Sequence, residues 1–226
     1  LNKLQTFYPY HEFCLKPIIS DGDRMDNVPI REIKGTGVFT NVFDKELDEN
    51  KISMAVHSMK DIAIENLFSD KYSYFNILKR ENPAECLIYP CSKSFDDIHT
   101  IGTSSTRRQL QWQFNSDKPF DFIEIRGNID TRIRKMLNGE CDALFLAYAG
   151  IKRYYDGKVD DCNVKILNLE KYHHCPGQGV ILIQSKHDLI LNYMLDILNN
   201  NTETNIAMEE KKILYKLSNH IKVTCD

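Results

Sequence analysis

Five arginines lie at or near the starts of three predicted helices, where they could bind a negatively charged ligand. They are Arg107, Arg108, Arg126, Arg132 and Arg153. A helix start presents free backbone N–H groups and a partial positive charge, which favour an anion. The planar guanidinium group adds a bidentate match to a carboxylate or a phosphate. The spacing therefore predicts a site for a ligand that carries several negative charges.

A second group of polar residues, Ser58, Lys60 and Asp61, follows the short apolar segment 52–57. A Lys-Asp pair after a strand is most often a surface ion pair, which contributes little to stability. A carboxylate held near cations stays ionised, however, and could stabilise a developing positive charge or transfer a proton. The residue types alone favour a surface turn and leave the catalytic interpretation open.

Hydroxyl side chains precede the first two arginines. Thr103, Ser104 and Ser105 stand where helix N-cap residues are typical. The consecutive arginines Arg107 and Arg108 oppose the helix dipole, and such a local conflict is typical of a functional site. A phosphate-binding loop is the alternative, but the run lacks the GxxxxGK[ST] pattern.

Glycines accompany two further candidate positions. Gly127 permits a tight turn from a strand into the helix that carries Arg132. Arg134 lies on a different side of that helix, so it is expected in solvent. Gln178 stands between two glycines, which indicates either a simple turn or a segment whose backbone approaches a ligand or crosses between domains.

Hydrophobic periodicity gives an alternation of strands and helices that positions these residues. The predicted strands are 12–19, 52–57, 72–78, 85–89, 100–102, 121–125, 143–147 and 180–184. The predicted helices are 38–49, 105–114, 130–138, one from 149, 187–199 and 204–217, with a linker at 199–201. This order favours α/β layers with largely parallel strands, whose carboxyl ends bind ligands. Lys60, Asp61, Arg107, Arg126 and Arg153 all follow predicted strands closely.

Composition limits the class of protein. The 226 residues suffice for one large domain or two small ones, with 42% hydrophobic and 27% charged residues. The net charge of −3 argues against a nucleic-acid partner. No apolar run has the length of a membrane span, so no membrane partner is expected. The absence of an initiating Met and of a natural C-terminal stop suggests that both ends are truncated.

The seven cysteines have irregular spacings, which favours free thiols in a reducing compartment over a disulfide framework or a zinc site. His173, His174 and Cys175 resemble metal ligands in type, but neighbouring strand residues point to opposite faces. No metal is therefore expected. The cytoplasm and a plastid stroma both fit reduced thiols.

The chain resembles porphobilinogen deaminase, also called hydroxymethylbilane synthase. The matching runs are 55–61, 102–108, 126–128 with 131–132, 149–153 and 177–179, in the order of that family. Each run alone is weak evidence for the family, but five runs in the same order are specific to it. The resemblance covers roughly residues 1–220.

The resemblance implies an α/β fold with two periplasmic-binding-protein-like lobes of mixed, mostly parallel sheets, plus part of a small third α+β domain. Domain 1 would comprise residues 1–78 and 179–198, and domain 2 residues 82–173. Residues 201–226 would be a fragment of domain 3, the cofactor-attachment domain. The family is usually monomeric, so a monomer is expected.

The resemblance also implies a reaction. A transferase of this family joins four porphobilinogen molecules into the linear tetrapyrrole hydroxymethylbilane, with release of ammonia, in haem biosynthesis. A dipyrromethane cofactor, bound as a thioether to a cysteine, is the point from which the chain grows. Each pyrrole bears acetate and propionate groups, so the growing chain is a polyanion, which would explain the arginines.

Residue roles follow from the same resemblance. Asp61 would contact pyrrole N–H groups and stabilise cationic intermediates, and Lys60 and Ser58 would hold carboxylates, with Asp61 and Lys60 as catalytic residues. The expected cofactor-binding residues are Ser58, Lys60, Asp61, Thr103, Ser104, Ser105, Arg107, Arg108, Arg126, Gly127, Arg132 and Cys225. Arg153 and Gln178 would bind substrate. Residues 21–37 match a mobile loop near the cleft.

Two departures from the family pattern affect the cofactor. The Arg and Ser motif of the family's first strand has no match, and the Gly-Gly-Cys turn that normally carries the cofactor is missing. Counting places Ile221 at the cysteine position, with Cys225 four residues on. Either Cys225 is the attachment site, or it is a free thiol and the anchor is absent from this sequence. The alternative function is a catalytically incomplete or non-enzymatic two-lobed anion-binding protein.

Overall fold

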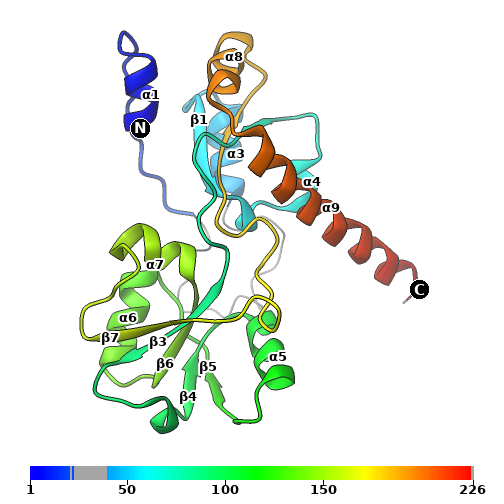
Figure 1. Ribbon diagram of the computed structural model, residues 1–226. Coiled ribbons are helices and arrows are strands. Elements are labelled where there is room, and N and C mark those ends of the chain that lie inside the picture. The colour runs from blue at the N-terminus through cyan, green and yellow to red at the C-terminus, as the bar shows by residue number, and fades with distance from the viewer. Residues whose placement is uncertain (21, 23–39, 225–226) are drawn as a thin grey trace.

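The structure, a computed structural model, describes residues 1–20, 22 and 40–224. Two sheets, each packed against helices, form the two lobes seen in Figure 1, which we call the lower lobe and the upper lobe after their places in that view. Within residues 40–200 the chain passes from one lobe to the other twice. The first crossing segment is residues 76–84, between β2 (Ser73–Phe75) of the upper lobe and β3 (Glu85–Pro90) of the lower lobe. The second is residues 167–180, on the way back.

The lower lobe contains a five-stranded sheet in the order β5-β4-β6-β3-β7. Its strands are β3 (Glu85–Pro90), β4 (Thr100–Gly102), β5 (Asp121–Ile123), β6 (Ala143–Ala147) and β7 (Cys162–Ile166). β4 is parallel to both β5 and β6, whereas β3 is antiparallel to β6 and β7. The chain enters this lobe along β3, and the other four strands run back toward the upper lobe.

Helices cover both faces of this sheet because its central strand is apolar on both sides. Alternate residues of β6 point to opposite faces, so Phe145 packs with Trp112 of α5 (Thr106–Asn115), and Leu144 packs against the other face. Helices α6 (Ile129–Leu137) and α7 (Tyr148–Tyr155) cover that second face. The sheet is therefore buried between two layers of helix.

The upper lobe contains a three-stranded sheet in the order β1-β8-β2. Its strands are β1 (Met54–Ser58), β2 (Ser73–Phe75) and β8 (Ile181–Ser185). Its described helices are α1 (Asn2–Phe7), α3 (Asn41–Asp48), α4 (Ile64–Leu67), α8 (Leu189–Leu198) and the first part of α9 (Asn201–Thr224). A short 3-10 turn, η2 (Met59–Asp61), follows β1 directly.

Strand direction differs from the prediction. The sheets are mixed, as expected, but four of the six strand pairings among the described residues are antiparallel, so the expectation of mostly parallel sheets is wrong. The physical reason is the pair of crossing segments. β8 returns from the lower lobe and so runs against β1 and β2, and β3 leaves the upper lobe and so runs against β6 and β7.

One local prediction is wrong, one strand was not predicted, and the linker at 199–201 has a defined structure. Residues 12–19 form no strand, because they join no ladder; they line a groove of about 880 Å³ beside β1 and α8 instead. β7 was not predicted, since its burial is only partial and its alternation weak. The predicted linker 199–201 is a structural joint, in which Asn199 Oδ1 accepts the backbone N–H of Asn76 at 2.8 Å and α9 begins at Asn201.

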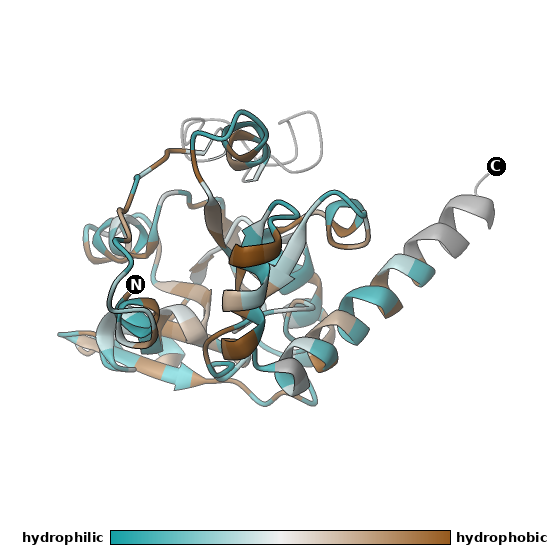
Figure 2. Ribbon diagram, turned by 90° about the horizontal axis from the view of Figure 1, so that it is seen from above, coloured by the Kyte–Doolittle hydropathy of each residue, from teal (hydrophilic) through white to brown (hydrophobic). Residues whose placement is uncertain are grey.

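Helix α9 is longer than predicted and extends away from the body of the molecule (Figures 1 and 2). Its first turns pack into the upper lobe, where Thr204, Ala207 and Lys211 are buried. Among the residues that the structure describes, no helix combines the length and apolar character needed to cross a bilayer.

Candidate active site

The carboxyl ends of β4, β5 and β6 face the upper lobe. Tyr148, the first residue after β6, donates its backbone N–H to the carbonyl of Ala84 in the first crossing segment (2.9 Å). Because β4 and β5 run in the same direction as β6, the loops that follow them lie at the same edge. The predicted arginines are on these loops and on the helices that begin there, so they line the side of the lower lobe nearest the upper one.

Arg107 and Arg108 share a buried carboxylate. Glu85, the first residue of β3, is completely buried and lies beside Ala147 at the end of β6. One of its oxygens accepts from Arg107, and the other accepts from Arg108 at 2.9 and 3.0 Å. The two guanidinium groups and one carboxylate carry a net charge of +1. This positive charge lies at the start of α5 and would attract an anionic ligand.

The two arginines differ in exposure. Arg108 is 7% exposed and also donates to the carbonyl of Phe145 at 3.0 Å, so its described contacts are with the protein interior. Arg107 keeps 30% of its side chain exposed and contacts the carbonyl of His173 in the second crossing segment. Arg107 is therefore the better placed of the two to meet a ligand.

The hydroxyl residues ahead of α5 stabilise its loop. Thr103 is buried, and its hydroxyl accepts the backbone N–H of Ser105 at 3.2 Å. Ser104 donates to the carbonyl of Ile125 at 2.6 Å, which joins the loops after β4 and β5. Ser105 occupies the N-cap position of α5 without a side-chain cap hydrogen bond. These contacts hold the loop, and the predicted cofactor contacts of the three residues stay a prediction.

Arg126 and Arg132 flank the start of α6. The Asn128 side chain caps this helix by accepting the backbone N–H of Thr131 at 2.8 Å. Gly127 has φ of +109°, which suits glycine, and Arg132 donates to its carbonyl at 2.6 Å. Arg126 is buried and donates to the carbonyl of Gly22 at 2.9 Å. Apart from residue 22, the predicted mobile loop 21–37 lies outside the described residues.

The second crossing segment brings parts of both lobes together. Arg153 of α7 donates to the carbonyl of Gly179 at 2.6 Å, and the next carbonyl, that of Val180, accepts the backbone N–H of Met59 at 3.0 Å. Glu81 in the first crossing segment donates its N–H to Gly179 as well (3.0 Å). Burial lowers the pKa of Arg153, and the nearby Glu81 carboxylate offsets part of this effect. One short stretch of backbone thus connects Arg153 with the turn that carries Lys60 and Asp61.

That turn presents its polar side chains outward. Met59 is completely buried, whereas Lys60 is half-buried and Asp61 is exposed. Within the described part of the chain, neither Lys60 nor Asp61 forms a side-chain hydrogen bond or an ion pair. Ser58, the last residue of β1, is also half-buried. Side chains of opposite charge that form no hydrogen bond with the described residues are suited to contact a ligand.

His57, which belongs to the same sequence run, points the other way. It is buried, and its Nε2 lies 2.8 Å from Oε1 of Gln184, whose Nε2 donates to Asp44 at 2.6 Å. Burial is the main reason that the pKa of His57 is lowered, although Gln184 and Asp44 act in the opposite direction. The imidazole is therefore neutral at pH 7 and supports the sheet rather than the site.

Residues 176–179 form a turn, as one of the two interpretations predicted, and Gln178 within it is buried rather than exposed. Its Nε2 donates to the carbonyl of Pro83 at 2.6 Å. Its Oε1 is a buried acceptor with no hydrogen-bond partner among the described residues. An unpaired buried acceptor is costly, so a donor from a ligand would stabilise it.

Sequence patterns missed four charged residues that organise this region: Glu85, Arg80, Glu210 and Lys211. Arg80 donates through both terminal nitrogens to Glu210 of α9, at 2.7 and 3.0 Å, and through Nε to the carbonyl of Gln178. Burial of Glu210 alone would raise its pKa, but hydrogen bonds from Arg80 and the N–H of Gly177 hold it below its usual range. Glu85 could have been noticed as a lone acid in an apolar predicted strand.

The cysteines differ in suitability as a covalent anchor. Cys225, the predicted attachment residue, lies outside the described residues. Burial raises the pKa of Cys86 to about 12 and that of Cys141 to about 11, so these thiols are poor nucleophiles.

Comparisons with known proteins identify the family. The model of a family described as "Porphobilinogen deaminase, dipyromethane cofactor binding domain" matches residues 1–190. The chain belongs to the porphobilinogen deaminase family. A porphobilinogen deaminase from Streptococcus sanguinis is 34% identical over 92% of this chain and 69% of that protein. One from Listeria welshimeri is 32% identical over 97% of this chain and 71% of that protein.

Porphobilinogen deaminases thus match this chain in sequence, and a solved structure of another class matches it in fold. A probable amino-acid ABC transporter extracellular-binding protein from Bacillus subtilis has a TM-score of 0.51 and 11% identity, covering 94% of this chain and 83% of that one. At this identity the likeness concerns the fold alone, and it confirms the predicted two-lobed arrangement.

Gly179 provides a direct test of how tightly the crossing segments are joined. Gly179 and Gly139 both have φ of +85°, but a Cβ on Gly179 would lie 2.2 Å from the carbonyl oxygen of Glu81, whereas one on Gly139 would meet nothing within 4 Å. We expect Gly139→Ala to lower the free energy of unfolding by about 1 kcal/mol through backbone strain. Gly179→Ala should lower the free energy of unfolding by about 1–3 kcal/mol more than Gly139→Ala does, because of the steric clash.

Urea unfolding of the two alanine variants measures the difference, and Gly139→Ala is the matched control for the left-handed backbone. Equal losses in both variants would show that the second crossing segment can move away from Glu81 without cost.

Proposed function

We propose that this chain catalyses the porphobilinogen deaminase reaction, in which four porphobilinogen molecules are joined into hydroxymethylbilane with release of ammonia. The observation that carries the proposal is the link through the second crossing segment. Arg153 and the backbone of Met59 bind successive carbonyls, those of Gly179 and Val180. Cationic groups of the lower lobe and the Lys60-Asp61 turn of the upper lobe therefore border one region.

The residues present fit the dipyrromethane group that the family binds. The group carries several carboxylates and two pyrrole N–H donors, so it needs cations and a few acceptors. The side chains of Lys60 and Asp61 form no hydrogen bond with described residues, Arg107 is partly exposed, and Gln178 Oε1 has no donor among the described residues. When bound as a thioether, the cofactor supplies the pyrrole end to which substrate is joined. Cys225 would hold it.

The chain's own residues have distinct roles in this proposal. Arg107, Arg126, Arg132 and Arg153, with Lys60 and Ser58, bind carboxylates and fix the orientation of the pyrroles. Arg108 acts mainly by holding Glu85, which in turn orients Arg107. Asp61 accepts hydrogen bonds from pyrrole N–H groups and stabilises positive charge that develops on the substrate as ammonia leaves. The loop 103–105 holds the start of α5 against the strand ends.

The same proposal includes the domain division implied by the family. Domain 1 would be residues 1–78 with 179–198, domain 2 residues 82–173, and domain 3 would begin at residue 201. Sheet membership supports it, since β1, β2 and β8 lie in one sheet and β3–β7 in the other. Glu210, Lys211 and their neighbours would then place the start of domain 3 against domain 1.

Two measurements test the function. We expect the purified chain to consume porphobilinogen and release ammonia, and intact-mass spectrometry to find an adduct of two pyrrole units that Cys225→Ser removes. An adduct without turnover would indicate a catalytically incomplete chain. The absence of both adduct and turnover, with porphobilinogen still bound, would leave a non-enzymatic anion-binding protein.

A further inference from the structure

Lys211 is a buried lysine that contacts the backbone of the Lys60-Asp61 turn. It lies on α9 and is 3% exposed. Its ammonium group donates to the carbonyl of Lys60 at 3.0 Å and to that of Ile62 at 3.2 Å. One turn earlier on the same face of α9, Ala207 packs in the apolar cluster that includes Met59 and Ile62. The first half of α9 is therefore the support on which this turn rests.

Keeping a cation at this position is costly. Burial lowers the pKa of Lys211, although Cys175 and Asp61 act in the opposite direction. Among the described residues no carboxylate lies within ion-pair distance of its Nζ, so the two carbonyls are its hydrogen-bond partners. An apolar side chain would fill the same space without the desolvation cost. A charge retained under such conditions is more typical of a functional requirement than of packing.

The two carbonyls flank Asp61. A single 3-10 turn satisfies few of its own backbone groups, and here Ile62 donates to Met59 at 3.3 Å. Lys211 binds the carbonyl of the residue before Asp61 and that of the residue after it. Since the Asp61 side chain has no hydrogen bond of its own within the described chain, its place depends on this backbone.

The neighbouring residue of α9 holds the crossing segments. Glu210 binds the Arg80 guanidinium with both oxygens and accepts the N–H of Gly177 at 2.9 Å. Glu210 and Lys211, which are consecutive residues of α9, thus hold the second crossing segment and the Lys60-Asp61 turn. Lys211 fixes the backbone beside Asp61, and Glu210 fixes the segment that contains Gly179. Together they fix the distance between Asp61 and the carbonyl that binds Arg153.

We propose that Lys211 is a positioning residue for Asp61, holding the peptide groups on either side of it so that the carboxylate faces the reacting pyrrole. This inference rests on the proposed function for its catalytic consequence. Its structural part, the clamping of residues 60–62, is independent of that function and can be tested without substrate.

Hydrogen exchange tests the clamp in the full chain. We expect Lys211→Met to raise the exchange rate of backbone amides in residues 59–63 by about tenfold, because local opening becomes easier. Lys211→Arg should restore protection in part. The control is Lys212→Met, since Lys212 is exposed and pairs with Glu209 one helical turn away. Unchanged exchange in Lys211→Met would overturn the inference. If that variant fails to fold, Lys211→Gln, whose amide is uncharged and whose side chain is one bond too short to reproduce both contacts, replaces it under the same criterion.

A double-mutant experiment tests the catalytic consequence. We expect Lys211→Met to lower kcat by about 10²-fold with KM changed less than about threefold. A misplaced catalytic group slows the chemical step more than it weakens substrate binding. Added to Asp61→Asn, it should cause no further loss of kcat, since both changes disable one carboxylate. Additive losses would show that Lys211 acts elsewhere. Absence of turnover in the unmodified chain would refute the proposed function and leave hydrogen exchange to decide on Lys211.

Discussion

Replacing Asp61 with asparagine is expected to lower turnover of porphobilinogen by at least about 10²-fold while leaving the protein folded. The substitution removes a negative charge that would stabilise developing positive charge, an effect of this size in enzymes that use fixed charges. The Asp61 side chain is exposed and forms no hydrogen bond within the described chain, so the free energy of unfolding should change by less than about 0.5 kcal/mol. Steady-state kinetics and urea unfolding measure the two effects.

The matched control is Glu65→Gln. Glu65 is an exposed acid on α4 in the same lobe, and the substitution changes the net charge by the same amount. We expect normal turnover in this variant. The cofactor adduct should also survive in Asp61→Asn, because the carboxylate-binding arginines are intact. Near-normal turnover in Asp61→Asn would remove Asp61 from the mechanism.

The second large effect is expected for Glu85→Gln, which should lower the free energy of unfolding by about 3 kcal/mol. The glutamine has nearly the same size, but it leaves Arg107 and Arg108 without their shared anion. Glu85 is completely buried and Arg108 nearly so, which means that water cannot replace the partner that Arg108 loses. Urea unfolding at neutral pH measures the loss.

Asp156→Asn is the control for the Glu85 experiment. Asp156 pairs with Lys152 at the surface, with 92% of its side chain exposed, and its left-handed backbone tolerates asparagine. We expect a change within about 0.5 kcal/mol. A loss of similar size in both variants would mean that the Glu85 carboxylate contributes no more than a surface ion pair.

Local patterns predicted most elements well. The apolar run of β6 is a strand at residues 143–147, as predicted, and α5 and α6 begin within a residue of the predicted starts. Those starts decide where Arg107 and Arg132 lie. Such features depend on side chains a few residues apart, which a single sequence displays directly.

Strand direction and the buried charges could not be predicted in this way. β8 lies between β1 and β2 only because the chain has crossed to the other lobe and returned. The Lys211 ammonium contacts the carbonyl of Lys60, a residue 151 positions away. Glu85 and Arg108 are 23 positions apart and on different elements. Periodicity records which face of an element is buried but not which distant residue lies against it.

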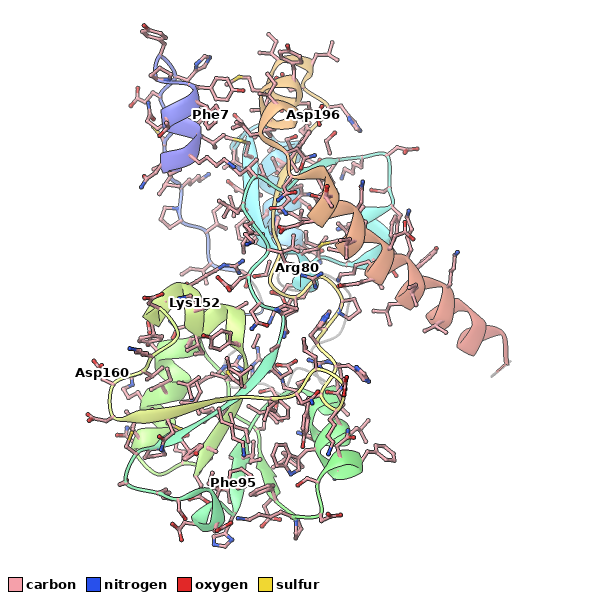
Figure 3. All side chains as sticks on the ribbon, viewed as in Figure 1. Phe7, Arg80, Phe95, Lys152, Asp160 and Asp196 are labelled. Atoms are coloured by element: carbon pink, nitrogen blue, oxygen red, sulfur yellow. The ribbon has the colours of Figure 1, made fainter. Side chains whose placement is uncertain are left out.

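The joined crossing segments have a mechanical consequence. If the lobes turned against each other about an axis through the point where Glu81 joins Gly179, each atom would move in proportion to its distance from that axis. Arg80 lies beside the axis, whereas Phe95 is at the far end of the lower lobe (Figure 3). Arg153 and the Met59–Asp61 turn are anchored at the pivot, so they would stay nearly stationary. Under the proposed function, such a turn would widen the molecule for a lengthening product while Lys60 and Asp61 keep one geometry.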